Sequence, residues 1–434
     1  MGSLETLSWL NRFLDETPGD REIGGEPRQV PGVCWSRVTP TVPPQPTLRL
    51  WSDEMAEKLG IARPNGVTLG GGALVEGMQP YAQRYGGHQF GNWAHQLGDG
   101  RAITLGEVEL AEEVLELQLK GAGKTPYSRF ADGKAVLRSS IREFLCSEAM
   151  FHLGVPTTRA LSLVTTGEMV VRDMLYDGNP APEIGAVVCR VAPSFIRFGS
   201  FQIHTADGNH ETLMKLLNHT ITNHFPDHRV DNDEGIITWL KEVAETTAEM
   251  IAHWMRVGFV HGVMNTDNMS IHGLTIDYGP YGWLENYDPN WTPNTTDTST
   301  RRYRYGQQAQ IGAWNIARLA ESVAPLVNDV QSLYPVLEHF ERKYIEFQNS
   351  MWGQKLGIDD FQESDEALVI ELDGLLQKVE TDMTLFFRLL SNIEAPEIGL
   401  LEYSFYDKNT IPTDEWNTWL EKWWTRVNTQ PNRA

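Results

Sequence analysis

Hydrophobic and polar residues alternate along the first half of the chain in the way expected of β-strands. Residues two apart in a strand share one face of the sheet, so such alternation predicts a strand. The segments 101–110 and 114–121 show it, with Leu115, Leu117 and Leu119 alternating with polar residues in the second. Further strands are expected near residues 160–174 and 184–192.

The second half of the chain shows the apolar spacing of amphipathic helices. From residue 209 onward, apolar residues recur every three or four positions, which is typical of helices packed on one face. Two helices are also expected earlier, over residues 49–62 and 139–153, the second with Ser140 and Glu143 as a capping box. The main helices expected in the second half cover residues 238–259, 310–327, 329–347 and 367–390.

The remaining segments are rich in glycine, proline and polar residues. Residues 1–48 predict an extended arm, while residues 67–100 and 283–306 predict long loops, the second expected to shape a groove for a protein substrate. The chain therefore predicts an α+β protein of two parts. Residues 1–200 form the arm and a strand-rich part, and residues 201–434 form a helical part.

Composition narrows the range of partners. The chain has 434 residues, 41% of them hydrophobic, which is enough for two domains or one large two-lobed enzyme. A net charge of −22 argues against a nucleic-acid or anionic-membrane partner, because both attract basic surfaces. The three cysteines are far apart in the sequence, which indicates a reducing compartment. With an acidic N-terminus that lacks a targeting pattern, this predicts a cytoplasmic bacterial protein rather than a mitochondrial one.

One short region departs from the acidic average. Six cations fall within the 24 residues 120–143, which contain only two acids, Asp132 and Glu143. This basic island favours an anionic ligand, although a solvated helix face would explain it equally well. Its cations are Lys120, Lys124, Arg129, Lys134, Arg138 and Arg142.

The string HGVMNTDNMSIHGLTIDYG, at residues 261–279, has the spacing of a kinase catalytic loop. In protein kinases an H-R-D-x-x-x-x-N loop precedes D-F-G, and its asparagine and the aspartate of D-F-G hold Mg²⁺. With His261 on the histidine, Asn268 falls on the metal-binding asparagine and Asp277 on that aspartate. Their oxygen ligands suit Mg²⁺ or Mn²⁺ bound with ATP.

The catalytic aspartate of that loop is missing. Val263 occupies its position and cannot accept a proton, whereas Asp267 supplies a nearby carboxylate that can act as a general base. A helix cap or a turn would also explain Asp267 beside Asn268. The preceding helix and the following D-Y-G favour a bilobal, protein-kinase-like fold with a strand-rich N-lobe and a helical C-lobe that contains the loop 261–279.

Other residues fit the same interpretation with less specificity. Lys120 ends a strand, and Glu143 follows on the next helix, which is the order of the lysine–glutamate pair that positions phosphates in kinases. Arg190 and Arg197 have the planar side chain that suits phosphate oxygens, although each alone is typical of a structural arginine. The turn LGDGRA, at residues 97–102, weakly resembles a glycine-rich phosphate loop and equally suits a hairpin turn.

A histidine-rich stretch offers an alternative metal site. The stretch has no helical zinc spacing, and a polar surface loop explains it better. Its members are His219, His224, His228, Asp227, Asp231 and Asp233.

Four strings together resemble the selenoprotein O family, the kinase-fold protein adenylyltransferases of bacteria and mitochondria. They are YAQRYGGHQFGNWAHQLGDGRA, LQLKGAGKTPYSRFADGKAVLRSSIREFLCSEAM, HGVMNTDNMS and IDYGPYGW. The resemblance covers most of the chain. It implies that ATP binds in an inverted pose, so that AMP passes from its α-phosphate to a Ser, Thr or Tyr hydroxyl of a client protein with release of pyrophosphate.

The resemblance also implies roles for individual residues. Asp267 would be the base, and Asn268 and Asp277 the metal ligands. The nucleotide-binding set would comprise Gly98, Gly100, Arg101, Lys120, Glu143, Asp132, Gly133, Arg190 and Arg197.

Two other functions are compatible with the same sequence. One is Mn²⁺-dependent transfer of UMP from UTP, since base recognition depends on pocket shape. The other is a non-catalytic nucleotide-binding pseudokinase scaffold, which Val263 favours and the intact Lys, Glu, Asn and Asp set disfavours. Family members usually continue to a redox Cys-x-x-Cys or selenocysteine motif, and the sequence has neither, so redox regulation through such a tail is left open. The expected partners are client proteins, some of them redox-related, and the expected state is a monomer.

Overall fold

The computed structural model describes residues 1–174, 177–428 and 430, which form two compact units. Unit 1 comprises Met1–Thr247, Asn265–Gly279 and Trp314–Leu337. Unit 2 comprises Ala248–Met264, Pro280–Ala313 and Glu338–Ala434. This division differs from the expected boundary at residue 200. The helical segments between residues 200 and 247 belong to the same unit as the sheet.

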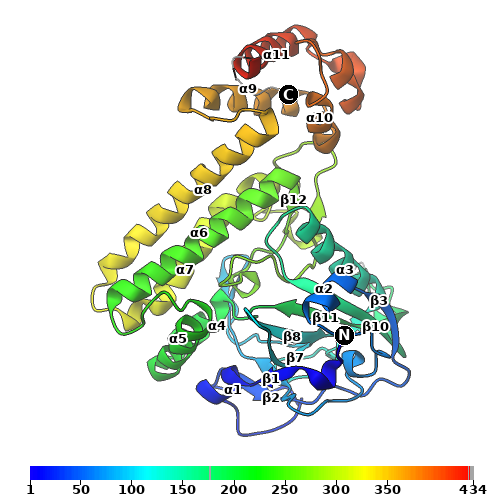
Figure 1. Cartoon of the computed structure of the whole chain (residues 1–434), viewed down its shortest axis with the longest axis vertical. Helices are drawn as coiled ribbons and strands as arrows, with labels where there is room; N and C mark the ends of the chain where they lie inside the picture. The colour runs from blue at the N-terminus through cyan, green and yellow to red at the C-terminus, as the bar shows by residue number, and fades with distance from the viewer. Residues whose placement is uncertain (175–176, 429, 431–434) are drawn as a thin grey trace. The chain divides into compact units, whose positions relative to one another are not determined.

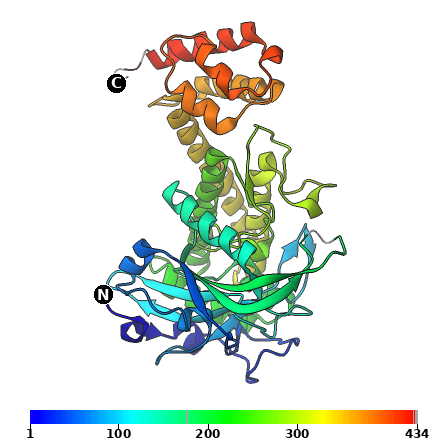
Figure 2. The same ribbon diagram turned by 90° about the vertical axis from the view of Figure 1, so that its right-hand side faces the viewer.

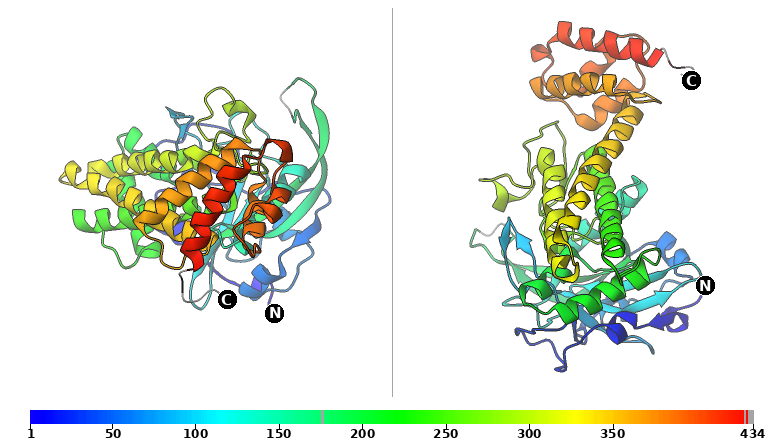
Figure 3. Two further views of the ribbon diagram at one scale, coloured as in Figure 1. Left: turned by 90° about the horizontal axis from the view of Figure 1, so that it is seen from above. Right: turned by 90° about the vertical axis from the view of Figure 1, so that its left-hand side faces the viewer.

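Unit 1 is built on a nine-stranded sheet in which neighbouring strands run antiparallel (Figure 1). The main path runs β2-β4-β7-β8-β11-β10-β3, with β1 paired to β7 and β9 paired to β11. Two of the strands, β10 and β11, form a long twisted hairpin (Figure 3). The bounds are β1 (Ser8–Leu10), β2 (Trp35–Arg37), β3 (Thr47–Trp51), β4 (Tyr81–Gln83), β7 (Ala102–Glu109), β8 (Val114–Lys120), β9 (Ala135–Val136), β10 (Arg159–Arg172) and β11 (Ala181–Ala192).

The four strands expected from alternation are all present, but both faces of the central ones are buried. Leu117 and Leu119 of β8 pack into the main apolar cluster of unit 1. Gln118 and Lys120 point to the opposite face and are also buried. The register sets Arg190 of β11 directly beside Gln118, so this second face carries polar side chains within the protein.

Helix α3 (Leu137–His152) covers that second face, where it contacts β10 and β11 (Figure 2). The expected helix is confirmed, but the expected capping box is wrong. Val136 is the N-cap and makes no side-chain cap, while Ser140 lies buried inside the helix. Because the helix begins at Leu137, Ser140 is not at the N-cap, and Glu143 instead forms an ion pair with Lys120.

The N-terminal segments were only partly predicted. Within the expected arm, β1 and β2 add short strands to the sheet, and α1 (Arg12–Glu16) forms one short helix. The expected helix over residues 49–62 is wrong in its first turn, where β3 pairs with β10. Ser52 then accepts a hydrogen bond from the Met55 amide at 3.3 Å and starts α2 (Asp53–Lys58).

The helices that follow the sheet begin earlier than expected. Helix α4 (Phe198–Ala206) precedes the predicted start and leads into α5 (His210–His224). The bounds of the next helices are α6 (Asp233–Val257), α7 (Gln308–Val323) and α8 (Tyr334–Leu356), each of which contributes residues to both units. The residues 265–279 run through unit 1 with only one short 3₁₀ turn, η3 (Thr266–Asn268).

The C-terminal part of unit 2 is a helical cluster around tryptophan and leucine. The expected helix over residues 367–390 is wrong, because it is interrupted where Asp382 caps a new helix by accepting from the Leu385 amide at 2.8 Å. The pieces are α9 (Glu366–Lys378) and α10 (Met383–Leu390). Helix α11 (Thr413–Asn428), which was not predicted, packs against α9 through Trp419 (Figure 3).

The structure contains both an extensive antiparallel sheet and many helices, so the α+β class is confirmed. In the part of the chain that the structure describes, no helix has the length and apolar character needed to cross a membrane.

Candidate active site

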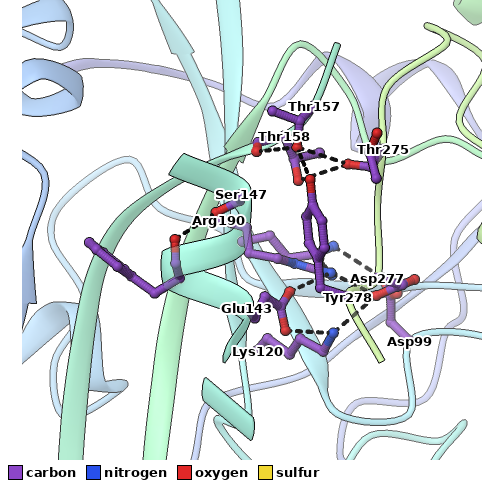
Figure 4. Close-up of polar contacts among 12 residues, drawn as sticks. Asp99, Lys120, Glu143, Ser147, Thr157, Thr158, Arg190, Thr275, Asp277 and Tyr278 are labelled. Carbon is purple, nitrogen blue, oxygen red and sulfur yellow. Dashed lines mark hydrogen bonds and ion pairs between the residues drawn. The ribbon is translucent and has the colours of Figure 1, made fainter. Parts of the chain in front are cut away.

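Lys120 at the end of β8 and Glu143 on α3 form a buried ion pair in unit 1. Lys120 Nζ lies 2.7 Å from Glu143 Oε2 and 3.2 Å from Asp277 Oδ1. Figure 4 shows the lysine and the glutamate directed toward each other beside Asp277. Burial lowers the pKa of Lys120, while the charges of Glu143 and Asp277 favour its protonated form. The spacing noted in the sequence therefore corresponds to a real contact.

Arg190 of β11 joins this pair from the neighbouring strand. Its Nη1 donates to Asp277 Oδ1 at 2.7 Å and to Glu143 Oε1 at 3.2 Å, and its Nη2 donates to Gln118 Oε1. Arg190 Nε is buried without a hydrogen-bond partner. Arg190 therefore spans two carboxylates and keeps one donor available for a further acceptor.

Arg197, the residue before α4, approaches from the other side and is 1% exposed. Its Nη1 donates to Asp277 Oδ2 at 2.6 Å and to the main-chain oxygen of Asp267 at 2.7 Å. Its guanidinium lies over the ring of Tyr85 and 3.9 Å from Asp99 Oδ1. One arginine thus connects Asp277 with the backbone of Asp267.

Asp277 is the centre of this charge cluster. Burial alone would raise its pKa, but Arg197, Lys120 and Arg190 hold the pKa well below the usual range. Its backbone has φ of +57°, a conformation that a non-glycine residue adopts at a cost. Three cations thus fix a carboxylate that stays ionised across the physiological range.

Asp267 lies in η3, and its carboxylate has a different environment. Gln89 Nε2 donates to Asp267 Oδ2 at 3.0 Å, whereas Asp267 Oδ1 is buried without a hydrogen-bond partner. Burial raises the pKa of Asp267 to about 6. A Cβ placed on Gly87 would lie 2.4 Å from Oδ1, so only glycine fits beside this carboxylate. The arrangement leaves one basic oxygen ready to accept a proton.

The glycine-rich turn before β7 packs on a loop that follows β8. Gly98 has φ of +96°, and a Cβ there would lie 2.4 Å from the ring of Tyr127. A Cβ on Gly100 would lie 2.9 Å from the Tyr127 carbonyl oxygen. Arg101 is exposed at the end of this turn. Packing against Tyr127 explains both glycines, and the contact with phosphate stays a prediction.

The structure places Asp132 and Gly133 outside the contacts of the Asp277 cluster. Asp132 forms a two-point ion pair with Arg172, with distances of 2.7 and 2.9 Å. Gly133 has φ of +72° and lies against the backbone of Gly123. Their roles in nucleotide binding stay predictions.

The basic island does not form one surface. Lys120 is buried in the cluster, whereas Lys134 pairs with Glu168, and Arg138 pairs with Glu183. The island therefore consists of cations that serve different parts of the sheet and α3.

The chemistry of the donors fits a hard divalent cation. Asn268 and Asp277 provide amide and carboxylate oxygens, which Mg²⁺ and Mn²⁺ prefer, and Asp267 Oδ1 is a further buried oxygen without a partner. Asp277 Oδ2 accepts from Arg197 and retains a lone pair for another contact. Among the described residues, no group of three or more His, Cys, Asp or Glu side chains forms a metal site.

That finding also applies to the histidine-rich stretch, whose members have separate partners. His219 Nδ1 lies 2.7 Å from Glu16, and His228 is hydrogen-bonded to Thr238 and Glu242. His224 packs against the rings of His219 and His272. These contacts explain the histidines as parts of the packing of unit 1.

Three residues of the site were not assigned from the sequence. Gln118 shares a face with Lys120 by strand alternation, which was a usable signal. Asp99 is buried and accepts a hydrogen bond from the Gln83 amide at 3.1 Å. Gln89 follows the adjacent glycines Gly86 and Gly87 closely in the sequence, which marks a loop, but no sequence pattern connects Gln89 with Asp267.

Comparison with known proteins identifies related chains. Relatives named "Protein nucleotidyltransferase YdiU" include one from Flavobacterium johnsoniae, which is 50% identical over 98% of this chain and 84% of its own length. Another, from Aromatoleum aromaticum, is 53% identical with the same coverage. A third, from Nitrosospira multiformis, is 56% identical over 88% of this chain and 70% of its own length.

Among solved structures, the chain matches ROP2 from Toxoplasma gondii, described as a virulence factor with a protein-kinase fold and no enzymatic activity. The match has a TM-score of 0.29 and 14% identity over 68% of this chain and 86% of that one, a likeness too weak to carry an argument. The sequence evidence is far stronger, because the family model described as "Protein adenylyltransferase SelO" matches residues 29–434. The chain belongs to the SelO family.

Proposed function

We propose that this protein transfers AMP from ATP to a Ser, Thr or Tyr hydroxyl of a client protein. The observation that carries the proposal is the presence in unit 1 of two carboxylates with different surroundings. Asp277 is held ionised by three cations, while Asp267 is a buried carboxylate with one unpartnered oxygen. Membership of a family described as protein adenylyltransferase supports the same reaction.

The cations of the cluster are suited to a polyphosphate. Lys120, Arg190 and Arg197 already bind carboxylate oxygens, and phosphate oxygens are likewise negatively charged acceptors of such hydrogen bonds. Arg190 Nε supplies a buried donor that has no partner. Electrostatic stabilisation by fixed donors provides most of the catalysis in phosphoryl-transfer chemistry, and we expect the same for transfer of a nucleotidyl group.

Asp267 would act as the base. Its pKa of about 6 leaves it mostly ionised at neutral pH and still basic enough to take a proton. The client hydroxyl oxygen would form a bond to the α-phosphorus while the bond from that phosphorus to the leaving oxygen breaks. Pyrophosphate would leave, and the hydroxyl proton would pass to Asp267. Gln89 would hold the carboxylate in position.

A bound Mg²⁺ or Mn²⁺ would neutralise charge on the phosphates, with Asn268 and Asp277 as its protein ligands. Asp277 would then serve both the cation and the three basic side chains around it. We therefore expect that Arg190 and Arg197 exchange part of their contact with Asp277 for contact with the nucleotide.

The proposal is tested by mass spectrometry of client or self-modified protein after incubation with ATP and Mg²⁺ or Mn²⁺. A mass gain equal to AMP on Ser, Thr or Tyr is expected, and a gain equal to phosphate would contradict it. Competition between ATP and UTP at fixed metal concentration distinguishes AMP transfer from UMP transfer. Nucleotide binding without any covalent product in either reaction would instead favour the scaffold function.

A further inference from the structure

Unit 2 contains a cavity with no role in the proposed reaction. It has a volume of about 590 Å³, within the range of small-molecule sites. Its walls come from α6, α8, α9 and the segment 287–306, and they expose much more apolar than polar surface. The apolar part of the wall includes Met255, Trp352, Phe361, Val369 and Ile370.

Lys355 of α8 lies half-buried in the wall of this cavity, and within the described residues it has no counter-ion. Its Nζ donates to the main-chain oxygen of Arg256 at 2.8 Å and lies 3.9 Å from the centre of the Phe387 ring. Within the described residues, no carboxylate forms an ion pair with it. Burial lowers the pKa of Lys355 to about 7, and the nearby charge of Arg256 lowers it further. An ammonium group in such a place is stabilised when an anion binds beside it.

The other charged groups around the cavity do not supply that anion. Glu366 and Asp373 of α9 line the same cavity, but Asp373 accepts hydrogen bonds from Tyr287 and Gln377, and neither acid pairs with Lys355. On α6, Arg256 adds a second cation to the wall, and His253 beside it has a pKa lowered to about 4 by burial. Lys355 and Arg256 therefore place two cations in the wall, while most of the remaining lining residues are apolar.

We propose that this cavity binds an amphipathic carboxylate, with the carboxylate paired to Lys355 and an apolar chain or ring against Met255, Trp352 and Phe361. A carboxylate can accept a charge-assisted hydrogen bond from the Lys355 ammonium, and the volume accommodates a medium-length hydrocarbon. Because the neutral amine must gain a proton to pair with the anion, binding includes proton uptake near neutral pH. The site is independent of the proposed nucleotidyl transfer.

Titration calorimetry with decanoate tests the site in the full chain. We expect saturable 1:1 binding to the wild type and at least tenfold weaker binding of 1-decanol, which has the same hydrocarbon without charge. Lys355→Met keeps the length and apolar stem of the side chain and should also weaken decanoate binding at least tenfold. Lys343→Met, on the same helix but outside the cavity wall, is the matched control and should bind as the wild type does.

The pH dependence provides a second readout that loss of folding would not reproduce. Decanoate binding to the wild type should weaken as pH rises above about 7, where Lys355 loses its proton, and this dependence should vanish in Lys355→Met. Equal binding of decanoate and 1-decanol, or unchanged decanoate binding in Lys355→Met, would overturn the proposal. So would the absence of decanoate binding to the wild type at millimolar concentration.

Discussion

The surroundings of Asp277 and of Asp267 differ although the two residues lie only ten positions apart in the chain. Asp277 has Lys120, Arg190 and Arg197 around it, so its pKa falls despite burial. Asp267 is also buried, but its carboxylate receives one hydrogen bond from Gln89, and its pKa rises to about 6. Burial raises the pKa of a carboxyl group unless opposite charge is brought with it.

This contrast separates two roles: the spacing aligns Asp277 with the metal-binding aspartate of a kinase loop, whereas the base of that loop would stand at Val263. A carboxylate with a low pKa is a poor base and a good partner for cations, whereas one with a pKa near 6 can take a proton at neutral pH. The difference agrees with a metal and phosphate role for Asp277 and a base role for Asp267. It also makes opposite predictions for the stability of variants at the two positions.

The largest effect is expected for Asp277→Asn. Loss of this charge leaves Lys120, Arg190 and Arg197 buried with one carboxylate fewer, so the free energy of unfolding should fall by about 3–5 kcal/mol at pH 7. Transfer activity should fall below detection. Urea unfolding and the mass-spectrometric assay measure the two effects.

Glu183→Gln is the control for Asp277→Asn, because it removes a carboxylate from the exposed pair with Arg138. It should change the free energy of unfolding by less than about 1 kcal/mol. A similar loss of stability in both variants would show that the cluster around Asp277 has no special energetic role.

A smaller effect on stability, with the opposite sign, is expected for Asp267→Asn. The raised pKa means that the folded state holds a proton between about pH 4 and pH 6 that the unfolded state has lost. The stability of the wild type therefore falls as pH rises through this window, and that of the variant does not. The variant should gain about 3 kcal/mol relative to the wild type from pH 4 to pH 7.

Activity should move in the other direction in the same variant. Removal of a general base typically costs about 10² to 10⁴ in rate, so Asp267→Asn should be nearly inactive while it is relatively more stable at pH 7. Urea unfolding at several pH values and the transfer assay give the two measurements. Wild-type activity in Asp267→Asn would contradict the assignment of the base.

The residues that take part in this contrast could largely be predicted from the sequence. The contacts that make the two carboxylates differ could not. Spacing alone aligned Asn268 and Asp277 with a kinase loop and suggested Asp267 as a candidate base. Strand alternation placed Lys120 at the end of β8, and chain order suggested Glu143 as its partner. These are local regularities of period and spacing, which a single sequence preserves.

What the sequence could not reveal depends on contacts between distant segments. Gln89 and Asp267 are 178 residues apart, and only the folded chain brings the amide to the carboxylate. The same holds for Arg197, which connects Asp277 with the backbone of Asp267. Predictions from short sequence patterns were wrong where a contact with a distant segment decides the structure. Glu143, for example, forms an ion pair with Lys120 and not the expected capping box.

The smallest effect is expected for Gln89→Leu, which tests whether Gln89 tunes the Asp267 carboxylate or only supports the fold around it. The hydrogen bond from Gln89 lowers the pKa of Asp267, so Gln89→Leu should raise it and shift the acidic limb of the pH–rate profile upward from about pH 6. At pH 6 the rate should fall about fivefold, because a rise of about one pKa unit lowers the ionised fraction of Asp267 from about one half to about one tenth, and it should recover toward the wild-type rate at alkaline pH.

Gln79→Leu makes the same change at a glutamine bonded to Arg37, away from Asp267, and should leave the profile unchanged. A purely structural role for Gln89 predicts a uniform loss of rate at every pH, with no shift of the acidic limb. The profile therefore distinguishes a residue that tunes the base from one that only supports the fold around it. Because the shift depends on the Asp267 carboxylate, any activity that remains in Asp267→Asn should show no acidic limb with or without Gln89→Leu.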